Sequence, residues 1–388
     1  MKGVRLLTTA AVIAVLVAAT SAVVNVQSTT LAYPTPRKGD VVDDYHGTKV
    51  ADPYRWMEDL DSKDVADWVA VQNTLTFGYL ERLPIRQHFH TRIHQLWNYP
   101  KTGIPTREAG RYFYSQNSGE QKQSTVYVRA SLTAPPRAVI EPDVMWPKAD
   151  MALSQWSPSP DGKLFAYCVS EGGADWQTVH VRDLATGKDL ADEVTWMRFS
   201  GLAWTKDGKG FFYSRYPEPP KGKALEAALS GQALYYHRAG TPQSSDTLIY
   251  ERKDLPTWFI GGGVTEDGKY LLVTMAKGSD NNNRLYYADL GDPMQPAVGA
   301  PIKPLVEADD AEYAPIGNAG SVLFLRSDKA APNRKVIALD IHDPEPSAWK
   351  TIVPERKESI ENIALIGERL VAQYLVEVQS RLSLYGLD

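Results

Sequence analysis

The segment Trp156–Tyr167 reads WSPSPDGKLFAY and has the composition of two β-strands joined by a turn. Its Asp161-Gly162 pair separates an apolar start from an aromatic and aliphatic run. Asp-Gly between strand-like runs is a strong local signal for a β-hairpin, because the turn requires a positive φ that glycine adopts without strain. The segment therefore predicts an antiparallel hairpin.

The same pattern recurs along the chain at intervals of about fifty residues, and a further strand-like run follows each copy. The other copies begin at Thr106, Ala203, Gly263, Asn318 and Ile366. A unit of this length holding four short strands is typical of a β-propeller blade. We therefore expect a mainly β fold, with six blades over residues 101–388. A β-sandwich with coincidental Asp-Gly hairpins is the alternative, which the near-constant spacing disfavours.

Residues 33–100 have a different pattern and predict an α-helical N-terminal arm. Trp68, Val71, Leu75 and Tyr79 recur at three- or four-residue spacing, which places them on one apolar helical face. Pro84 interrupts this helix, and a second helix is expected over residues 87–97. Helices this apolar need a surface to pack on.

The first residues are typical of an export signal. A positive start at Lys2 and Arg5 precedes an apolar run, and small residues then offer a cleavage site, so we expect a signal peptide over residues 1–22. An uncleaved anchor in the inner membrane is the alternative. Since Cys168 is the single cysteine, no disulfide can form within the chain, and an exported protein without disulfides fits the bacterial periplasm.

The bulk composition is that of an ordinary soluble protein, with 43% hydrophobic and 23% charged residues. A formal net charge of −5 argues against nucleic acid as a partner.

Few residues in the chain carry an obvious chemistry. No serine has glycine two residues before and two after it, so the nucleophile elbow of α/β-hydrolases is absent from the sequence, and so are glycine-rich phosphate loops. His90 and His94 have the spacing of a helical metal pair, and Ser279–Arg284 resembles an acidic metal loop. An exposed helix face and an ordinary polar turn are the favoured interpretations. We therefore predict no metal and no cofactor, and Cys168 as a buried small side chain.

Longer motifs resemble a known family. YHGTKVADPYRWMEDLDS at Tyr45–Ser62 is similar to the N-terminal signature of the prolyl oligopeptidases, serine peptidases that cleave short peptides after proline. The resemblance continues in order through NYPKTGIP, RYFYSQNSGEQKQSTVYV, GADWQTVHVRDL, MRFSGLAWTKDGKGFFYSRYP, NRLYYADL and SRLSLYGLD. It covers the chain from Tyr33 to its last residue.

This resemblance implies a seven-bladed propeller that caps an α/β-hydrolase domain and admits only short peptides, with the helical arm packed on the hydrolase domain. It implies a catalytic Ser, Asp and His that all follow the propeller, so we expect this chain to lack them and to be inactive alone. It further implies a monomeric full-length protein that acts on short proline-containing peptides. Phe199 matches an aromatic residue that lines the substrate pocket in the family. Phe259 stands where many relatives have Met, and Ser279 stands where some have Cys. These departures leave the pocket's detailed preference open.

Two other functions remain possible at this point. A periplasmic propeller could be a binding scaffold without catalysis, although a scaffold has no need of the DPYRWMEDLD segment. A propeller enzyme with its site in the central channel, such as a metal-dependent hydrolase, is the third possibility.

Overall fold

The computed structural model describes residues 31–388 except 149 and 225–226. The predicted signal peptide, residues 1–22, lies outside the described residues. The chain divides into two compact units, one ending at Ile93 and the other running His94–Asp388. Within the described ranges, no helix combines the length and the apolar character needed to cross a membrane.

The first unit holds a hairpin of β1 (Val42–Tyr45) and β2 (Thr48–Ala51), the 3-10 helix η1 (Arg55–Glu58) and helix α2 (Lys63–Leu80). The hairpin was not predicted, although its two-residue turn, His46-Gly47, has positive φ at both positions. Ser62 caps α2, since its hydroxyl accepts a hydrogen bond from the Val65 amide at 3.3 Å.

The second predicted helix is observed as α3 (Pro84–Trp97), which extends from the first unit into the second. It begins at Pro84 and not at residue 87, because proline suits the first turn of a helix, where its missing N–H leaves no bond unmade. Val65 is the single buried residue of α2, and none is buried in α3. Both apolar faces are therefore largely exposed in the described structure.

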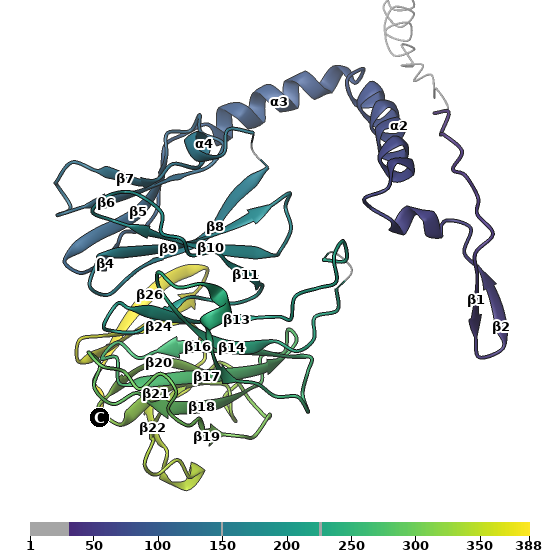
Figure 1. Cartoon of the computed structure of the whole chain (residues 1–388). Helices are drawn as coiled ribbons and strands as arrows, with labels where there is room; N and C mark the ends of the chain where they lie inside the picture. Colours follow the sequence, from purple (N-terminus) through teal and green to yellow (C-terminus); the bar gives the residue numbers. More distant parts are fainter. Residues whose placement is uncertain (1–30, 149, 225–226) are drawn as a thin grey trace, which may run out of the picture. The chain divides into compact units, whose positions relative to one another are not determined.

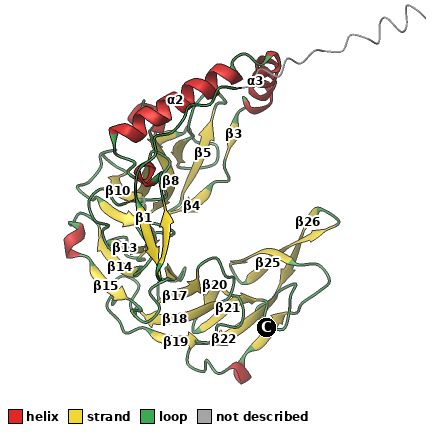
Figure 2. Ribbon diagram, turned by 90° about the vertical axis from the view of Figure 1, so that its right-hand side faces the viewer, coloured by secondary structure: helices red, strands yellow, loops and turns green. Residues whose placement is uncertain are grey.

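The second unit consists of antiparallel sheets that follow the sequence repeats (Figures 1 and 2). Blade 1 contains β3 (Lys101–Thr102), β4 (Thr106–Glu108), β5 (Arg111–Asn117), β6 (Thr125–Arg129) and β7 (Arg137–Ile140), followed by α4 (Pro142–Met145). Blade 2 contains β8 (Met151–Pro158), β9 (Leu164–Glu171), β10 (Gln177–Asp183) and β11 (Val194–Met197). Blade 3 contains β12 (Ala203–Trp204), β13 (Gly210–Arg215), β14 (Ala233–Arg238), η2 (Gln243–Ser245) and β15 (Thr247–Tyr250).

Three further blades complete the described structure. Blade 4 contains β16 (Trp258–Val264), β17 (Tyr270–Lys277), β18 (Asn283–Asp289) and β19 (Lys303–Val306). Blade 5 contains β20 (Tyr313–Ala319), β21 (Val322–Ser327), β22 (Lys335–Asp340), η3 (Pro346–Ala348) and β23 (Lys350–Val353). Blade 6 contains β24 (Ile360–Ile366), β25 (Arg369–Val376) and β26 (Gln379–Tyr385).

Blades 2 and 3 form one continuous sheet, contrary to the separate blades that the repeat suggests. The connection is a single pair between β11 and β13, Met197 with Arg215. Every other blade is a sheet of its own.

The repeated turns have the predicted conformation, because each turn glycine has a positive φ, between 58° and 78°. These glycines are Gly110, Gly162, Gly208, Gly268, Gly320 and Gly367. The aspartate has a role that the pattern did not reveal. Asp161 accepts hydrogen bonds from the Ser159 hydroxyl at 2.7 Å and the Lys163 amide at 3.0 Å, and Asp207 and Asp267 repeat both bonds.

The core lies between successive blades. Phe113 of blade 1 and Phe165 of blade 2 stack with ring centroids 5.9 Å apart, and each later pair of neighbouring blades shares its own buried cluster. A blade thus buries its faces against its neighbours, which stabilises the repeat only as an array. Cys168 is fully buried in the cluster between blades 2 and 3, as predicted, and burial raises the pKa of its thiol.

Candidate functional site

Phe199 follows β11 in a backbone conformation that turns its ring outward. Its φ is +53°, Trp196 has a φ of +61°, and the Phe199 side chain is 51% exposed. Positive φ costs a non-glycine residue of order 1–3 kcal/mol and persists where the surroundings hold it in place. Two such residues within four positions, one in β11 and one just after it, therefore mark Phe199 as a candidate contact residue.

The cause of this conformation is a set of hydrogen bonds from three blades. The buried Gln232 side chain donates to the Arg198 carbonyl at 3.0 Å and accepts from the Ile260 amide of β16 at 2.7 Å. Gln155 of β8 donates to the Ser200 carbonyl at 2.8 Å, and Ser200 Oγ accepts from the Ser214 amide of β13 at 2.8 Å. The turn is thus pre-organised.

The Phe199 ring lies within an aromatic and cationic cluster. Its centroid is 5.5 Å from that of Phe259, at the start of β16. The Arg198 guanidinium lies 4.9 Å from the Phe199 ring and 5.4 Å from that of Trp176, and it forms an ion pair with Asp175. The half-exposed ring of Phe199 and the partly buried ring of Phe259, beside a fixed guanidinium, form a surface suited to an apolar side chain with a nearby carbonyl.

Ser279 is exposed in the turn between β17 and β18. It lies at the same end of blade 4 as Phe259, because the ladder pairs Phe259 with Ala276 and Trp258 with Lys277. The hydrogen bonds and ring contacts of the described residues do not involve Ser279. The structure therefore brings Phe199 and Phe259 together and leaves Ser279 as a neighbour at the same blade end.

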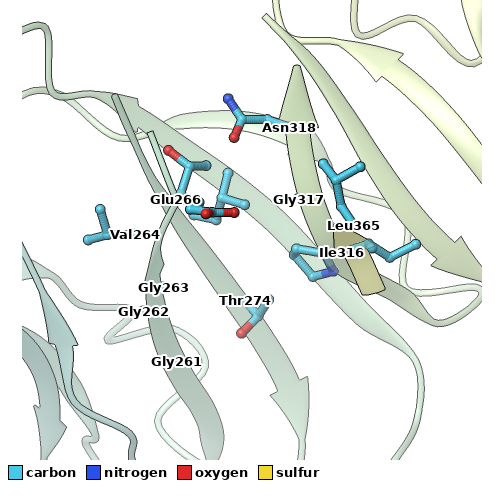
Figure 3. A pocket seen from close by; sticks show the side chains of 13 residues that line it. Gly261, Gly262, Gly263, Val264, Glu266, Thr274, Ile316, Gly317, Asn318 and Leu365 are labelled. Carbon is cyan, nitrogen blue, oxygen red and sulfur yellow. The ribbon is translucent and has the colours of Figure 1, made fainter. Parts of the chain in front are cut away.

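A cavity of about 520 Å³ lies between the first strands of blades 4, 5 and 6. Figure 3 shows its lining, which comes from β16, β17, β20 and β24 together with Thr265 and Glu266 beyond the end of β16. Gly261, Gly262 and Gly263 leave one wall without side chains, and Leu365 and Ile316 make the opposite wall apolar. Glu266 is the one ionisable group of the lining, so this cavity can accommodate a chain but offers no acid–base pair.

The buried group His237 lies between two carboxylates, an arrangement that no local signal in the sequence indicated. Its Nδ1 is 2.7 Å from Asp246 Oδ1 and its Nε2 is 2.8 Å from Asp192 Oδ1. The three side chains are at most 1% exposed, and Asp246 also accepts from the Tyr213 hydroxyl at 2.7 Å. With both ring nitrogens bonded and no solvent contact, His237 has no free atom for proton transfer to a substrate.

The electrostatics of this group predict how stability depends on pH. Burial alone would lower the pKa of His237, but hydrogen bonds and charge from Asp192 and Asp246 outweigh it and raise the pKa to about 9. Because the folded pKa exceeds the ordinary value of 6.5, the stabilisation is complete below pH 6.5 and is lost as the pH rises through 9. The difference corresponds to about 3 kcal/mol. Thermal melts at pH 6 and pH 9.5 are expected to show this loss.

His237→Gln should flatten that pH dependence, because the variant has no proton to lose in this range. An equal loss of stability in the variant and the unmodified chain between pH 6 and pH 9.5 would contradict the assignment.

The fold and site define a β-propeller with an aromatic contact surface, and comparison with known proteins specifies its kind. Residues 33–388 match the family model described as the prolyl oligopeptidase N-terminal β-propeller domain. The chain therefore belongs to the prolyl oligopeptidase family. Its sequence corresponds to the propeller region of that family.

Individual relatives agree with this assignment. The chain is 33% identical to the prolyl endopeptidase of Elizabethkingia meningoseptica over 373 residues, which are 96% of this chain and 52% of the relative. It is 33% identical to prolyl oligopeptidase A of Amanita bisporigera, over 91% of this chain and 50% of the relative. Prolyl oligopeptidase B from Galerina marginata, solved with a 35mer hydrolysis and macrocyclization substrate, superimposes with a TM-score of 0.78 at 30% identity, covering 91% of this chain and 52% of that one. The chain spans about half the length of these relatives.

Proposed function

We propose that this chain is the propeller part of a serine peptidase that hydrolyses short peptides after proline. The observation that carries the proposal is the family match over residues 33–388 together with the pre-organised Phe199–Phe259 pair. The catalytic Ser, Asp and His would belong to the half of the relatives' length that this chain does not span, so the chain alone is expected to be inactive.

In this proposal the propeller restricts access to the hydrolase domain and contributes to substrate binding. Phe199 and Phe259 form an apolar wall for the substrate residue beyond the neighbour of the proline, and Ser279 lies at its margin. The exposed faces of α2 and α3 would pack on the hydrolase domain. Export to the periplasm with removal of residues 1–22 is part of the same proposal.

The test begins with the protein isolated from its own cells through an antibody against the propeller. The chain has a mass of 43.0 kDa, and it spans 52% of a relative, so a complete peptidase should have a mass of about 80 kDa. That species should react with a fluorophosphonate, which labels activated serines, and should cleave short proline-containing peptides. A species near 40 kDa that remains unlabelled would overturn the proposal in favour of a binding scaffold.

Phe199→Ala, introduced into the full-length protein, is expected to raise KM about tenfold for a peptide with a large apolar residue at the Phe199 subsite. Loss of one apolar contact surface costs about 1–3 kcal/mol of binding, and it leaves kcat nearly unchanged because no reacting atom is touched. Met294→Ala is the matched control, since Met294 is a similarly exposed apolar residue, at 59%. A KM equal to that of the control would remove Phe199 from the binding surface.

A further inference from the structure

The glycines of β16 leave the cavity of Figure 3 open on the side of blade 4. Gly262 approaches Leu234 of blade 3, so the alternating residues Gly261 and Gly263 face away from blade 3. A Cβ at Gly263 would meet no atom within 4 Å, and its φ lies outside the left-handed region. The backbone therefore does not require glycine at this position, and a side chain there would occupy the cavity.

The face of β16 that forms the cavity floor also carries Phe259. Side chains alternate between the two faces of a strand, so Phe259 shares a face with Gly261 and Gly263. β16 pairs with β17 alone among the described strands, which leaves its other edge free for a second chain. Gly263 is four residues from Phe259, about 13 Å at ~3.3 Å per residue. One strand face thus leads from the Phe199–Phe259 pair into the cavity.

The polar atoms at the far end of the cavity favour a cation. The main-chain carbonyl of Glu266 accepts from Lys206 Nζ at 2.8 Å, but the Glu266 carboxylate forms no ion pair among the described residues. Asn318 donates to Asp267, the neighbour of Glu266, at 2.9 Å, and both of its side-chain hydrogen bonds use the amide nitrogen. Its carbonyl oxygen and the carboxylate are acceptors suited to an ammonium group.

We propose that this cavity is a remote subsite for the N-terminal segment of a peptide substrate, an inference that rests on the proposed peptidase function. The peptide lies extended along β16, upstream of the residue that contacts the Phe199–Phe259 pair. An apolar side chain about four residues upstream fills the space above Gly263, against the apolar wall of the cavity. The N-terminal ammonium group, about three residues further, binds Glu266. The cavity therefore selects for the length of the peptide and for a free N-terminus.

The probes are two peptides of sequence GSGLGSGLAP with a C-terminal fluorescein, one with a free amine and one N-acetylated. The second leucine is placed for the Phe199–Phe259 pair and the first for the cavity. Fluorescence anisotropy would follow their titration with the 388-residue chain. The free amine should bind about fivefold more tightly than the acetylated form, as expected of a partly exposed ion pair. Glu266→Gln should remove this difference, and the control Glu345→Gln, at an exposed glutamate outside the lining, should keep it.

Gly263→Leu tests the cavity itself. It should weaken binding of both probes at least tenfold, because the leucine occupies the apolar part of the subsite. Gly299→Leu is the matched control, since a Cβ there also meets no atom within 4 Å and Gly299 lies outside the lining. The comparison of the two probes is made on the unmodified chain, so it stays decisive if Gly263→Leu disturbs folding. Equal binding of the two probes, or no saturable binding, would overturn the proposal.

A peptide too short to reach the cavity separates this inference from the proposed function. The full-length protein should cleave N-acetyl-Leu-Ala-Pro-aminomethylcoumarin, and Gly263→Leu should leave that cleavage unchanged. Cleavage of this peptide without discrimination between the probes would overturn the remote subsite alone. Absence of cleavage would overturn the proposed function, and with it the role of the cavity in substrate binding.

Discussion

Replacing His237 by alanine is expected to destabilise the propeller by about 3–5 kcal/mol. The substitution leaves the carboxylates of Asp192 and Asp246 buried at the junction of blades 2 and 3 without their cationic partner, and an uncompensated buried charge is costly. The midpoint of thermal unfolding, followed by circular dichroism at pH 6, should fall by roughly 10 °C.

His342→Ala is the control for this variant, since His342 is exposed. Its melting temperature should match that of the unmodified chain. If His237→Ala melts with the control, the hydrogen bonds of His237 to Asp192 and Asp246 do not stabilise the fold, and the stabilising role assigned to this cluster would be wrong.

Gly210→Ala is expected to destabilise the chain by about 2–4 kcal/mol, because blade 3 has no space for one methyl group. A Cβ at Gly210 would lie 2.3 Å from the carbonyl oxygen of His237 and 2.5 Å from the Tyr236 hydroxyl oxygen. The first of these atoms is backbone in β14, and the hydrogen bonds of His237 to Asp192 and Asp246 hold that strand in place. Relief therefore requires separation of β13 from β14.

The matched control is Gly299→Ala, whose Cβ would meet no atom within 4 Å and whose φ is not positive. Urea unfolding of both variants measures the difference in the free energy of unfolding, and the control should stay within about 0.5 kcal/mol of the unmodified chain. Equal stability of the two variants would show that β13 and β14 can separate at little cost.

The blade repeat could be predicted because its signal is local. Two features define the Asp-Gly turn: the positive φ of its glycine and the hydrogen bonds that its aspartate accepts. Both lie within five residues, as Ser159–Lys163 shows. The helical arm was predicted for the same reason, from three- and four-residue spacing. The predicted start of α3 lies three residues too late, because Pro84 breaks the helical pattern in sequence although proline is also favoured in a first helical turn.

The candidate site could be predicted only in part. Phe199 and Phe259 were named from the family resemblance, and their ring contact is a property of the folded chain. Gln232, which joins the Arg198 carbonyl to the Ile260 amide, gave no local signal. Glutamine is common at exposed positions, and its burial is visible only where the blades meet.

Short-range physics thus establishes much of this protein before folding is considered: turn chemistry and strand alternation specify the blades, and their recurrence specifies a propeller. Contacts between blades decide which side chains are buried and which charged groups meet. Asp192, His237 and Asp246 form one buried charged group because three separate segments meet there. The physical reason is that charge pairing and burial depend on distance in space, and in a propeller the nearest surface belongs to the next blade.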